Sequence, residues 1–206
     1  MAFKSTPYRY GLVAQVLHWC VALLFAVQYV SVYYRHWFTT KGTSENDLAL
    51  QVHLAFGLTV VLFVVPRLVW SRFDETPGPV DSHRWEHLAA RLVHWALYFF
   101  MITMPISGYL YSSKEVHLLA IPRFGDTSLW HWMAHTWGLH LKEDVRNPMR
   151  IFHREIAGAL VLWMLIALHV VAALYHHYVR RDVTLTRMLP GRSPGAAVAS
   201  PNSRTS

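Results

Sequence analysis

The chain has 206 residues, of which 53% are hydrophobic and only 15% are charged, a balance typical of a single-domain membrane protein. Its single cysteine, Cys20, excludes an intrachain disulfide, an iron–sulfur cluster, a zinc–thiolate site and covalent attachment of a c-type haem. The net charge of +7 needs no nucleic acid, because a topological signal and contact with anionic membrane lipid account for it.

Four runs without any Asp, Glu, Lys or Arg dominate the chain. They cover residues 10–34, 48–66, 92–113 and 156–179. Each is close to the ~20 residues that a helix needs to cross a bilayer. The first run is too long for the apolar core of a signal peptide. We therefore predict an all-α membrane domain over residues 1–190 with four transmembrane helices. A disordered, Ser/Pro/Ala-rich tail is expected over residues 191–206.

The first three predicted helices carry one histidine each: His18, His53 and His94. We expect Pro66 to end the second helix, and Pro105 to kink the third. A loop of about 40 residues follows the third helix. Its segment 128–137 has aromatic residues and histidines at helical spacing, which indicates a helix lying in the membrane interface.

The fourth run, residues 156–179, has His169 near its middle. His153 lies just before the run, and the pair His176–His177 lies near its end. An ionisable residue inside a membrane helix is costly and is therefore a functional-site hypothesis by default. Because imidazole is the commonest protein ligand for metals, these histidines are candidate ligands.

The distribution of basic residues predicts the orientation. The short segments before the first helix, between the second and third, and after the fourth are dense in Lys and Arg. They hold Lys4, Arg9, Arg67, Arg72, Arg84, Arg180, Arg181, Arg187 and Arg192. The opposite side has Arg35 and Lys41, then six basic residues over the longer segment 114–154. Because Lys and Arg concentrate in short cytoplasmic segments, both termini are predicted to be cytoplasmic.

With that orientation the histidines fall at two depths. His18 and His169 lie at one level towards the cytoplasm, and His53 and His153 lie near the outer ends of their helices, about 24 Å away along a straight fourth helix. Two imidazoles at each depth predict two bis-histidine haem sites on facing helices. Small residues beside the ligands leave room for haem, and Arg residues at both faces could neutralise its propionates. The small residues are Ala22, Gly57 and Ala173.

Several short motifs together resemble one protein family. They are QVLHW at 15–19, VHLAFG at 52–57, VHWALY at 93–98, PISG at 105–108, LHVVAALYHHY at 168–178 and TLTRMLP at 184–190. Over about residues 8–190 the chain resembles the bacterial cytochrome b561 family, which is related to the b-type subunits of nickel hydrogenases and formate dehydrogenases.

The resemblance implies a four-helix dihaem cytochrome of the bacterial inner membrane that exchanges electrons with quinone. It implies His18 and His169 as ligands of the inner haem b, and His53 and His153 as ligands of the outer one. In the family the two ligands on the fourth helix are usually fourteen residues apart, but here they are sixteen apart. At about 100° per residue this places them about 160° apart around an α-helix.

Two explanations of the sixteen-residue spacing stay open. A bulge or a differently wound first turn could rotate His153 inward, or another outer histidine such as His140 could replace it.

The other histidines also have two interpretations. His94 suits a quinone contact, a propionate contact or proton delivery, or has a purely structural role. His176 and His177 face the cytoplasmic interface, and one could contact haem or quinone. His131 and His135 stand four residues apart and could bind a metal.

Two functions remain open on the sequence. One, implied by the resemblance because some members of the family act in this way, is a self-contained redox enzyme that oxidises superoxide at the outer face and reduces quinone at the inner face. Arg146, Arg150 and Arg154 would draw the anionic substrate to the outer face. The other is a membrane-anchor haem subunit that relays electrons between a partner oxidoreductase or soluble cytochrome and quinone. A histidine-rich metal transporter is a third class. It is disfavoured because no carboxylate lies in any of the four runs.

Overall fold

A computed structural model describes residues 2–80 and 83–191, which form helices joined by loops. Three helices come first: α1 (Leu12–Trp37), α2 (Ser44–Phe73) and α3 (Arg84–Tyr111). The connection to the fourth holds η1 (His117–Leu119), η2 (Phe124–Asp126) and α4 (Ser128–Trp137). The fourth long helix consists of η3 (Leu141–Arg146), α5 (Asn147–Arg150), η4 (Ile151–Val161), α6 (Leu162–Tyr175) and η5 (His176–Arg180). Apart from Gly191, the predicted disordered tail lies outside the described residues.

The predicted four membrane helices are confirmed. α1, α2, α3 and the continuous run Leu141–Arg180 are each long and apolar enough to cross a bilayer, at 26, 30, 28 and 40 residues. All four exceed the ~20 residues that a span needs, because their polar end turns stay helical. At the start of α2, for example, the Thr43 side chain accepts a hydrogen bond from the Asn46 N–H.

The prediction that Pro66 ends the second helix is wrong. α2 continues through Pro66 to Phe73, and α3 likewise continues through Pro105. A proline inside a helix removes one backbone hydrogen bond, and membrane helices tolerate this where neighbouring groups satisfy the freed carbonyl. The consequence is that Arg67, which the sequence placed in a loop, lies inside the membrane-spanning helix.

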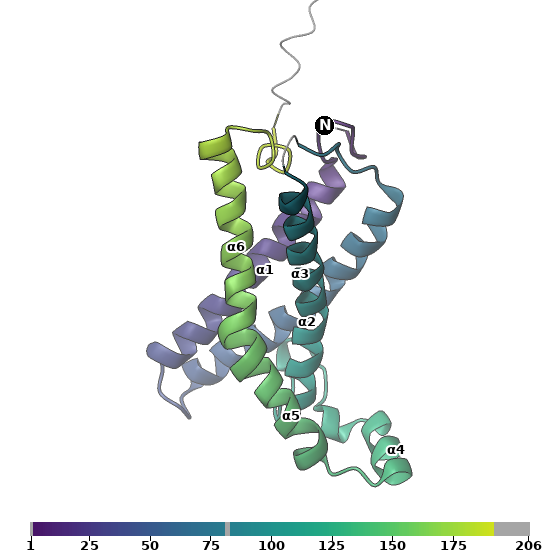
Figure 1. Cartoon of the computed structure of the whole chain (residues 1–206). Coiled ribbons are helices and arrows are strands. Elements are labelled where there is room, and N and C mark those ends of the chain that lie inside the picture. Colours follow the sequence, from purple (N-terminus) through teal and green to yellow (C-terminus); the bar gives the residue numbers. More distant parts are fainter. Residues whose placement is uncertain (1, 81–82, 192–206) are drawn as a thin grey trace, which may run out of the picture.

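The helices form two layers. α1 and α2 pack extensively against each other, α2 also packs against α3, and the fourth long helix packs mainly against α3. Figure 1 shows α3 and the fourth helix in front of the inclined α1–α2 pair. The fourth helix is therefore joined to α1 and α2 largely through side chains.

An apolar cluster lies in the middle of the bundle. Val21, Leu24, Val60 and Val64 are buried, with Val64 0% exposed, and partly buried residues including Tyr98 pack around them. His18 precedes this cluster on α1, and His53 precedes it on α2, which runs in the opposite direction. The cluster therefore separates two histidine levels.

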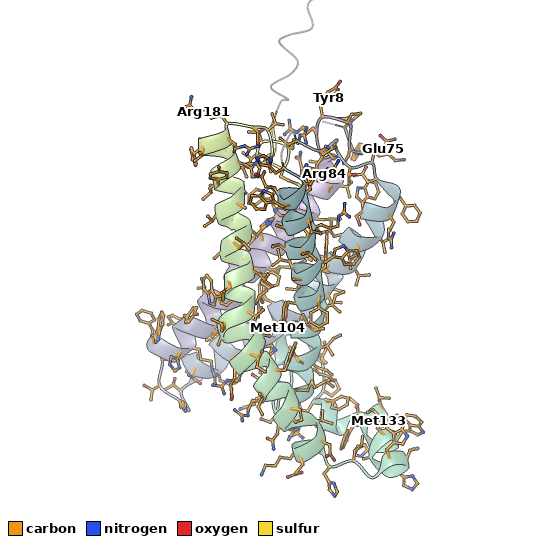
Figure 2. The ribbon with its side chains drawn as sticks, in the orientation of Figure 1. Tyr8, Glu75, Arg84, Met104, Met133 and Arg181 are labelled. Atoms are coloured by element: carbon orange, nitrogen blue, oxygen red, sulfur yellow. The ribbon has the colours of Figure 1, made fainter. Side chains whose placement is uncertain are left out.

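The chain segments before α1, between α2 and α3, and after η5 meet at one end of the bundle, which we call the inner end. Ser5 Oγ donates to Asp74 Oδ2 at 2.5 Å, and a guanidinium nitrogen of Arg187 donates to the Gly78 carbonyl at 2.7 Å. Figure 2 shows Tyr8, Glu75, Arg84 and Arg181 together at this end, and Met133 of α4 at the opposite, outer end. The termini of the four-helix core thus lie on the same side.

Candidate functional site

Two pairs of histidines face each other across the bundle. The outer pair consists of His53 on α2 and His153 on η4, whose ring centroids are 6.2 Å apart. The inner pair consists of His18 on α1 and His169 on α6, also with ring centroids 6.2 Å apart. Each pair joins the α1–α2 layer to the fourth helix. The structure thus brings together all four histidines that the sequence singled out, in the predicted pairs.

The separation within each pair suits one metal ion held between two imidazoles. A metal–imidazole nitrogen bond of about 2 Å on each side places the two ring centroids about 6 Å apart. Two donors per site leave the remaining coordination positions to another group, as a porphyrin supplies. Within residues 2–80 and 83–191, no three His, Cys, Asp or Glu side chains gather as they would around a bare metal ion. The donor sets therefore fit haem.

The ring of His153 is held by the backbone of α3. Its Nδ1 atom lies 2.9 Å from the Met104 carbonyl oxygen and 3.1 Å from Ser107 Oγ, which itself donates to the same carbonyl at 3.0 Å. A carbonyl oxygen only accepts, so Nδ1 of His153 carries the hydrogen and donates it. The other ring nitrogen, Nε2, is then unprotonated and available as a metal ligand. A backbone carbonyl is the usual second-shell partner of a ligating histidine.

His53 is oriented in the same way. Its Nδ1 lies 3.3 Å from the Gln28 carbonyl oxygen on α1. The hydrogen again sits on Nδ1, which leaves Nε2 as the potential ligand. Both outer imidazoles are therefore fixed in the tautomer that metal binding requires, by carbonyls that belong to two different helices.

The sixteen-residue spacing is explained by the winding of the fourth helix. Residues Ile151–Val161 form a π-helix, and Leu162–Tyr175 an α-helix. A π-helix has about 4.4 residues per turn, or ~82° per residue. The chain takes eight steps from His153 to Val161 at about 82° each, and eight from Val161 to His169 at about 100° each. The two imidazoles therefore come to within about 20° of the same face of the helix.

The outer imidazole also requires a glycine on α3. A Cβ atom placed on Gly108 would lie 2.8 Å from Cε1 of His153, closer than real Cβ atoms approach. The PISG motif at 105–108 thus supplies both Ser107 and Gly108 to the His153 ring. In the sequence this motif indicates a kink and the family resemblance, and nothing in it points to a contact with His153.

His94 lies beside the inner pair, whereas the predicted loop histidines lie apart from both pairs. His140 has a side chain that is 79% exposed and lies 3.7 Å from Asp144, and His131 and His135 are exposed on α4. His94 is exposed on α3, and its ring centroid is 5.2 Å from that of His169. His176 is the first residue of η5 at the inner end, and its Nδ1 lies 2.5 Å from Asp182 Oδ2.

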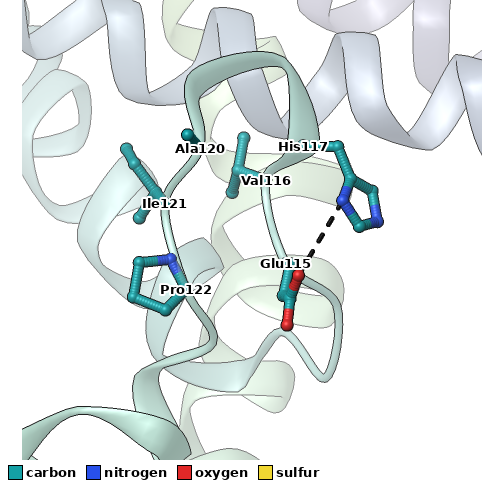
Figure 3. Close-up of a pocket in the computed structure, with 6 residues that line it drawn as sticks. All are labelled: Glu115, Val116, His117, Ala120, Ile121 and Pro122. Carbon is teal, nitrogen blue, oxygen red and sulfur yellow. Dashed lines mark ion pairs between the residues drawn. The ribbon is translucent and has the colours of Figure 1, made fainter.

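A shallow pocket of about 380 Å³ lies in the loop after α3 at the outer end. It is lined by Glu115, Val116, His117, Ala120, Ile121 and Pro122. Figure 3 shows the ion pair between His117 and Glu115. His117 Nδ1 and Glu115 Oε2 are 3.8 Å apart, and the two side chains are 63% and 50% exposed. The pocket shares no residue with the histidine pairs and is not part of this site.

Sequence reasoning missed the residues that support the pairs. The carbonyls of Gln28 and Met104 cannot be seen in a sequence, because every residue has one. Arg67 and Tyr98 form a hydrogen bond of 3.0 Å near the inner pair. The position of Arg67 could have been found from the sequence, because it directly follows a 19-residue run without charge and the second helix could continue past it.

Comparison with known proteins agrees with this architecture. Residues 9–191 match the family described as prokaryotic cytochrome b561. Cytochrome b561 homolog 2 of Escherichia coli (strain K12) is 30% identical over 203 residues, covering 92% of this chain and 95% of that protein. Cytochrome b561 homolog 1 of the same strain is 29% identical over 177 residues, covering 85% of this chain and 94% of that protein. A probable superoxide oxidase, CybB, of Yersinia pestis is 27% identical over 190 residues, covering 88% and 96%. The chain, a multi-pass membrane protein, belongs to the prokaryotic cytochrome b561 family.

Proposed function

We propose that this protein is a dihaem b-type cytochrome that carries electrons across the inner membrane between an outer donor and quinone. Family membership implies haem b. The observation that carries the proposal is the presence of two facing imidazole pairs, each with ring centroids 6.2 Å apart. His18 and His169 hold the inner haem, and His53 and His153 hold the outer one. When bound, haem supplies a reversible one-electron acceptor at each level.

The protein contributes orientation and insulation. The carbonyls of Gln28 and Met104 hold the outer imidazoles with the hydrogen on Nδ1, which would leave Nε2 to bind the metal, and Ser107 Oγ lies 3.1 Å from Nδ1 of His153. The apolar cluster around Val60 and Val64 lies between the two levels. Because burying a charge in such a layer is costly, it keeps ions and water out, so that only electrons pass between the levels.

The outer level suits an anionic electron donor. The positive charges of Arg154, Arg35 and Arg150 act on Tyr111, whose ring centroid lies 5.3 Å from that of His153. Arg150 is paired with Glu155 at 2.7 Å, which leaves Arg35 and Arg154 as the main attractive charges. Clustered charge of one sign raises the local concentration of the opposite ion.

Superoxide is the donor that this surface and the relatives support, since a relative is named a probable superoxide oxidase. In the balanced reaction, two superoxide anions give up one electron each and leave as two oxygen molecules. One quinone takes up the two electrons and two protons and becomes quinol. We place quinone at the inner level, and the protons come from the cytoplasm.

The first test is haem content and ligation. Purified protein is expected to contain about two non-covalent haems b per chain in a pyridine haemochrome assay. Its electron paramagnetic resonance spectrum is expected to be low-spin, as two imidazole ligands give. Protein without haem, or with a mainly high-spin signal, would overturn the proposal.

The second test separates the sites. His169→Ala or His18→Ala is expected to remove the inner haem and leave the outer one, and His153→Ala is expected to do the reverse. His140→Ala is the matched control, because His140 is a solvent-exposed histidine at the outer end. Loss of the outer haem in His140→Ala, with retention in His153→Ala, would show that the outer ligand comes from the loop.

The third test is activity of the protein alone. Reconstituted protein with both haems is expected to reduce a quinone analogue when superoxide is generated on the outer side. If superoxide does not reduce the haems but a separate oxidoreductase subunit does, the alternative function as an electron-relaying membrane anchor is correct.

A further inference from the structure

Arg67 is a cation in α2 that directly follows the charge-free run 48–66, near the inner end of this candidate membrane span. It lies within the span Ser44–Phe73 and is half-buried. A positive charge in the apolar part of a membrane protein is costly and normally has a partner or a function. The partner of Arg67 is therefore informative.

The surroundings of Arg67 supply a neutral acceptor and no anion. Its Nε donates to the hydroxyl oxygen of Tyr98 at 3.0 Å, and its Cζ lies 5.9 Å from the centroid of the Tyr98 ring. No carboxylate of the described residues forms an ion pair with Arg67. With Nε occupied, the two terminal nitrogens remain to donate. That end of a guanidinium binds a carboxylate through two parallel hydrogen bonds.

Arg67 is linked to the inner histidine level through Tyr98. At that level the ring centroids of His94 and His169 are 5.2 Å apart. Tyr98, which orients Arg67, lies on α3 one helical turn after His94 and packs against the apolar cluster. Arg67 follows the buried residue Val64 by three positions on α2, so it lies on the core-facing side of that helix, towards its inner end.

We infer that Arg67, oriented by Tyr98, binds a propionate carboxylate of the inner haem and raises the reduction potential of that haem. This inference rests on the proposed ligation by His18 and His169. The carboxylate supplies the anion that Arg67 lacks among the residues that the structure describes. The oxidised haem carries one more positive charge than the reduced haem, so a fixed cation nearby disfavours oxidation. Arg67 is therefore a positioning residue that also tunes the potential.

The test is an optical redox titration of full-length protein with both haems bound. The inner wave is identified as the one missing in His169→Ala. In Arg67→Gln the inner haem is expected to shift about tenfold in favour of its oxidised form at a given potential, which is 59 mV for one electron. The outer wave is expected to stay unchanged. Arg72→Gln, which removes an exposed cation from the last turn of the same helix, is the matched control and is expected to shift neither wave.

Two further variants keep the inference testable if Arg67→Gln does not retain the inner haem. Arg67→Lys keeps the charge and is expected to keep the haem with a potential close to that of the wild type. Tyr98→Phe removes the acceptor for Nε and is expected to lower the inner potential by less than Arg67→Gln does. An unchanged inner wave in both Arg67→Gln and Tyr98→Phe, or an equal shift in Arg72→Gln, would overturn the inference. Wild-type protein without two waves would instead overturn the proposed function.

Discussion

The contact between Gly108 and His153 is the tightest requirement at the level of single residues. A methyl group at position 108 would lie 2.8 Å from Cε1 of His153, and the adjoining Nδ1 is held at 2.9 Å by the Met104 carbonyl of the same helix. The ring cannot move away without breaking that hydrogen bond. Overpacking of this kind costs roughly 1–3 kcal/mol.

Gly108→Ala is therefore expected to displace His153 and abolish the low-spin signal of the outer haem. The inner haem, held by residues on α1 and α6, serves as the internal control and is expected to keep its signal. Electron paramagnetic resonance and the melting temperature of the purified variant are the measurements. An unchanged outer signal would mean that His153 is not a ligand.

Single residues also show how far the sequence could predict the site. The partners of His18, His53 and His169 follow from their depth along apolar helices, because 1.5 Å per residue fixes the height of each side chain. Their support does not follow, since the carbonyls of Gln28 and Met104 become acceptors only through the packing of α1 on α2 and of α3 on η4. Arg67 was misplaced because Pro66 was expected to end the helix.

At the level of elements, the π-helix Ile151–Val161 is the feature that a sequence pattern predicts least well. The spacing of His153 and His169 indicated a differently wound segment as one of two possibilities, because such a segment turns two residues sixteen positions apart to one face. The choice between a rewound helix and a loop ligand depended on packing against α3. Gly158 and Ala157 on this segment are small enough to let the helix approach α3.

The turn after η5 is a second element whose stability can be tested. Asp182 accepts hydrogen bonds from the Thr184 N–H at 2.8 Å and from His176 Nδ1 at 2.5 Å. Partial burial tends to raise the pKa of the Asp182 carboxyl, but the hydrogen bonds from Thr184 and His176 outweigh it and lower the pKa below its ordinary value. A carboxyl with a lowered pKa stabilises the fold above its unfolded pKa of about 3.9 and loses this contribution as the pH falls through the folded value.

Asp182→Asn is therefore expected to destabilise the inner end at neutral pH. This turn leads to the Met188 carbonyl, which accepts from Trp19 Nε1 at 2.8 Å. Limited proteolysis in detergent is expected to cut the variant faster than the wild type at pH 7. The two rates are expected to begin to converge as the pH falls below about 4, the unfolded pKa, and to meet only below the lowered pKa of the folded protein, where the wild-type carboxyl becomes protonated. A difference that does not shrink at any pH below about 4 would contradict the role of the ionised carboxylate.

The short helix α4 is expected to rest in the outer membrane interface. Thr127 caps its start, Gly138 ends it with φ of 64°, and Trp130 is buried against Phe124. Leu129, Trp132 and Trp137 remain 58%, 56% and 58% exposed. Trp side chains are enriched where headgroups meet acyl chains.

A nitroxide label tests this placement of α4. In a Cys20→Ser background, a label at Trp132→Cys is expected to be more accessible to oxygen, which concentrates in lipid, than to a water-soluble nickel complex. A label at His140→Cys, in the solvent-exposed loop, is the control and is expected to show the reverse. Equal exposure of both labels to the nickel complex would place α4 in water.

For the whole molecule, the division into two layers gives the histidine pairs a structural role. The fourth helix packs mainly against α3, and only a few contacts, such as the 2.8 Å hydrogen bond from Trp163 Nε1 to Tyr33 Oη, tie it to α1. Cofactors bound between the layers would complete that interface. The number and order of the helices could be predicted because each charge-free run spans a bilayer, whereas the layer arrangement depends on contacts between distant segments.

The orientation in the membrane is the last prediction, and it concerns the whole chain. The N-terminal segment, the α2–α3 connection and the segment after η5 meet at the inner end, as Figure 2 shows for Tyr8, Glu75, Arg84 and Arg181. Without Arg67, these short segments and the helix ends next to them hold Lys4, Arg9, Arg72, Arg84, Arg180, Arg181 and Arg187. Dense Lys and Arg in short segments stay in the cytoplasm. A green fluorescent protein fused after Ser206 is therefore expected to fluoresce, and alkaline phosphatase fused after His140 is expected to be active. Phosphatase fused after Gly78 is the control and is expected to be inactive. Phosphatase that is active after Gly78 and inactive after His140 would mean that the orientation is the reverse, with His18 and His169 on the outer side.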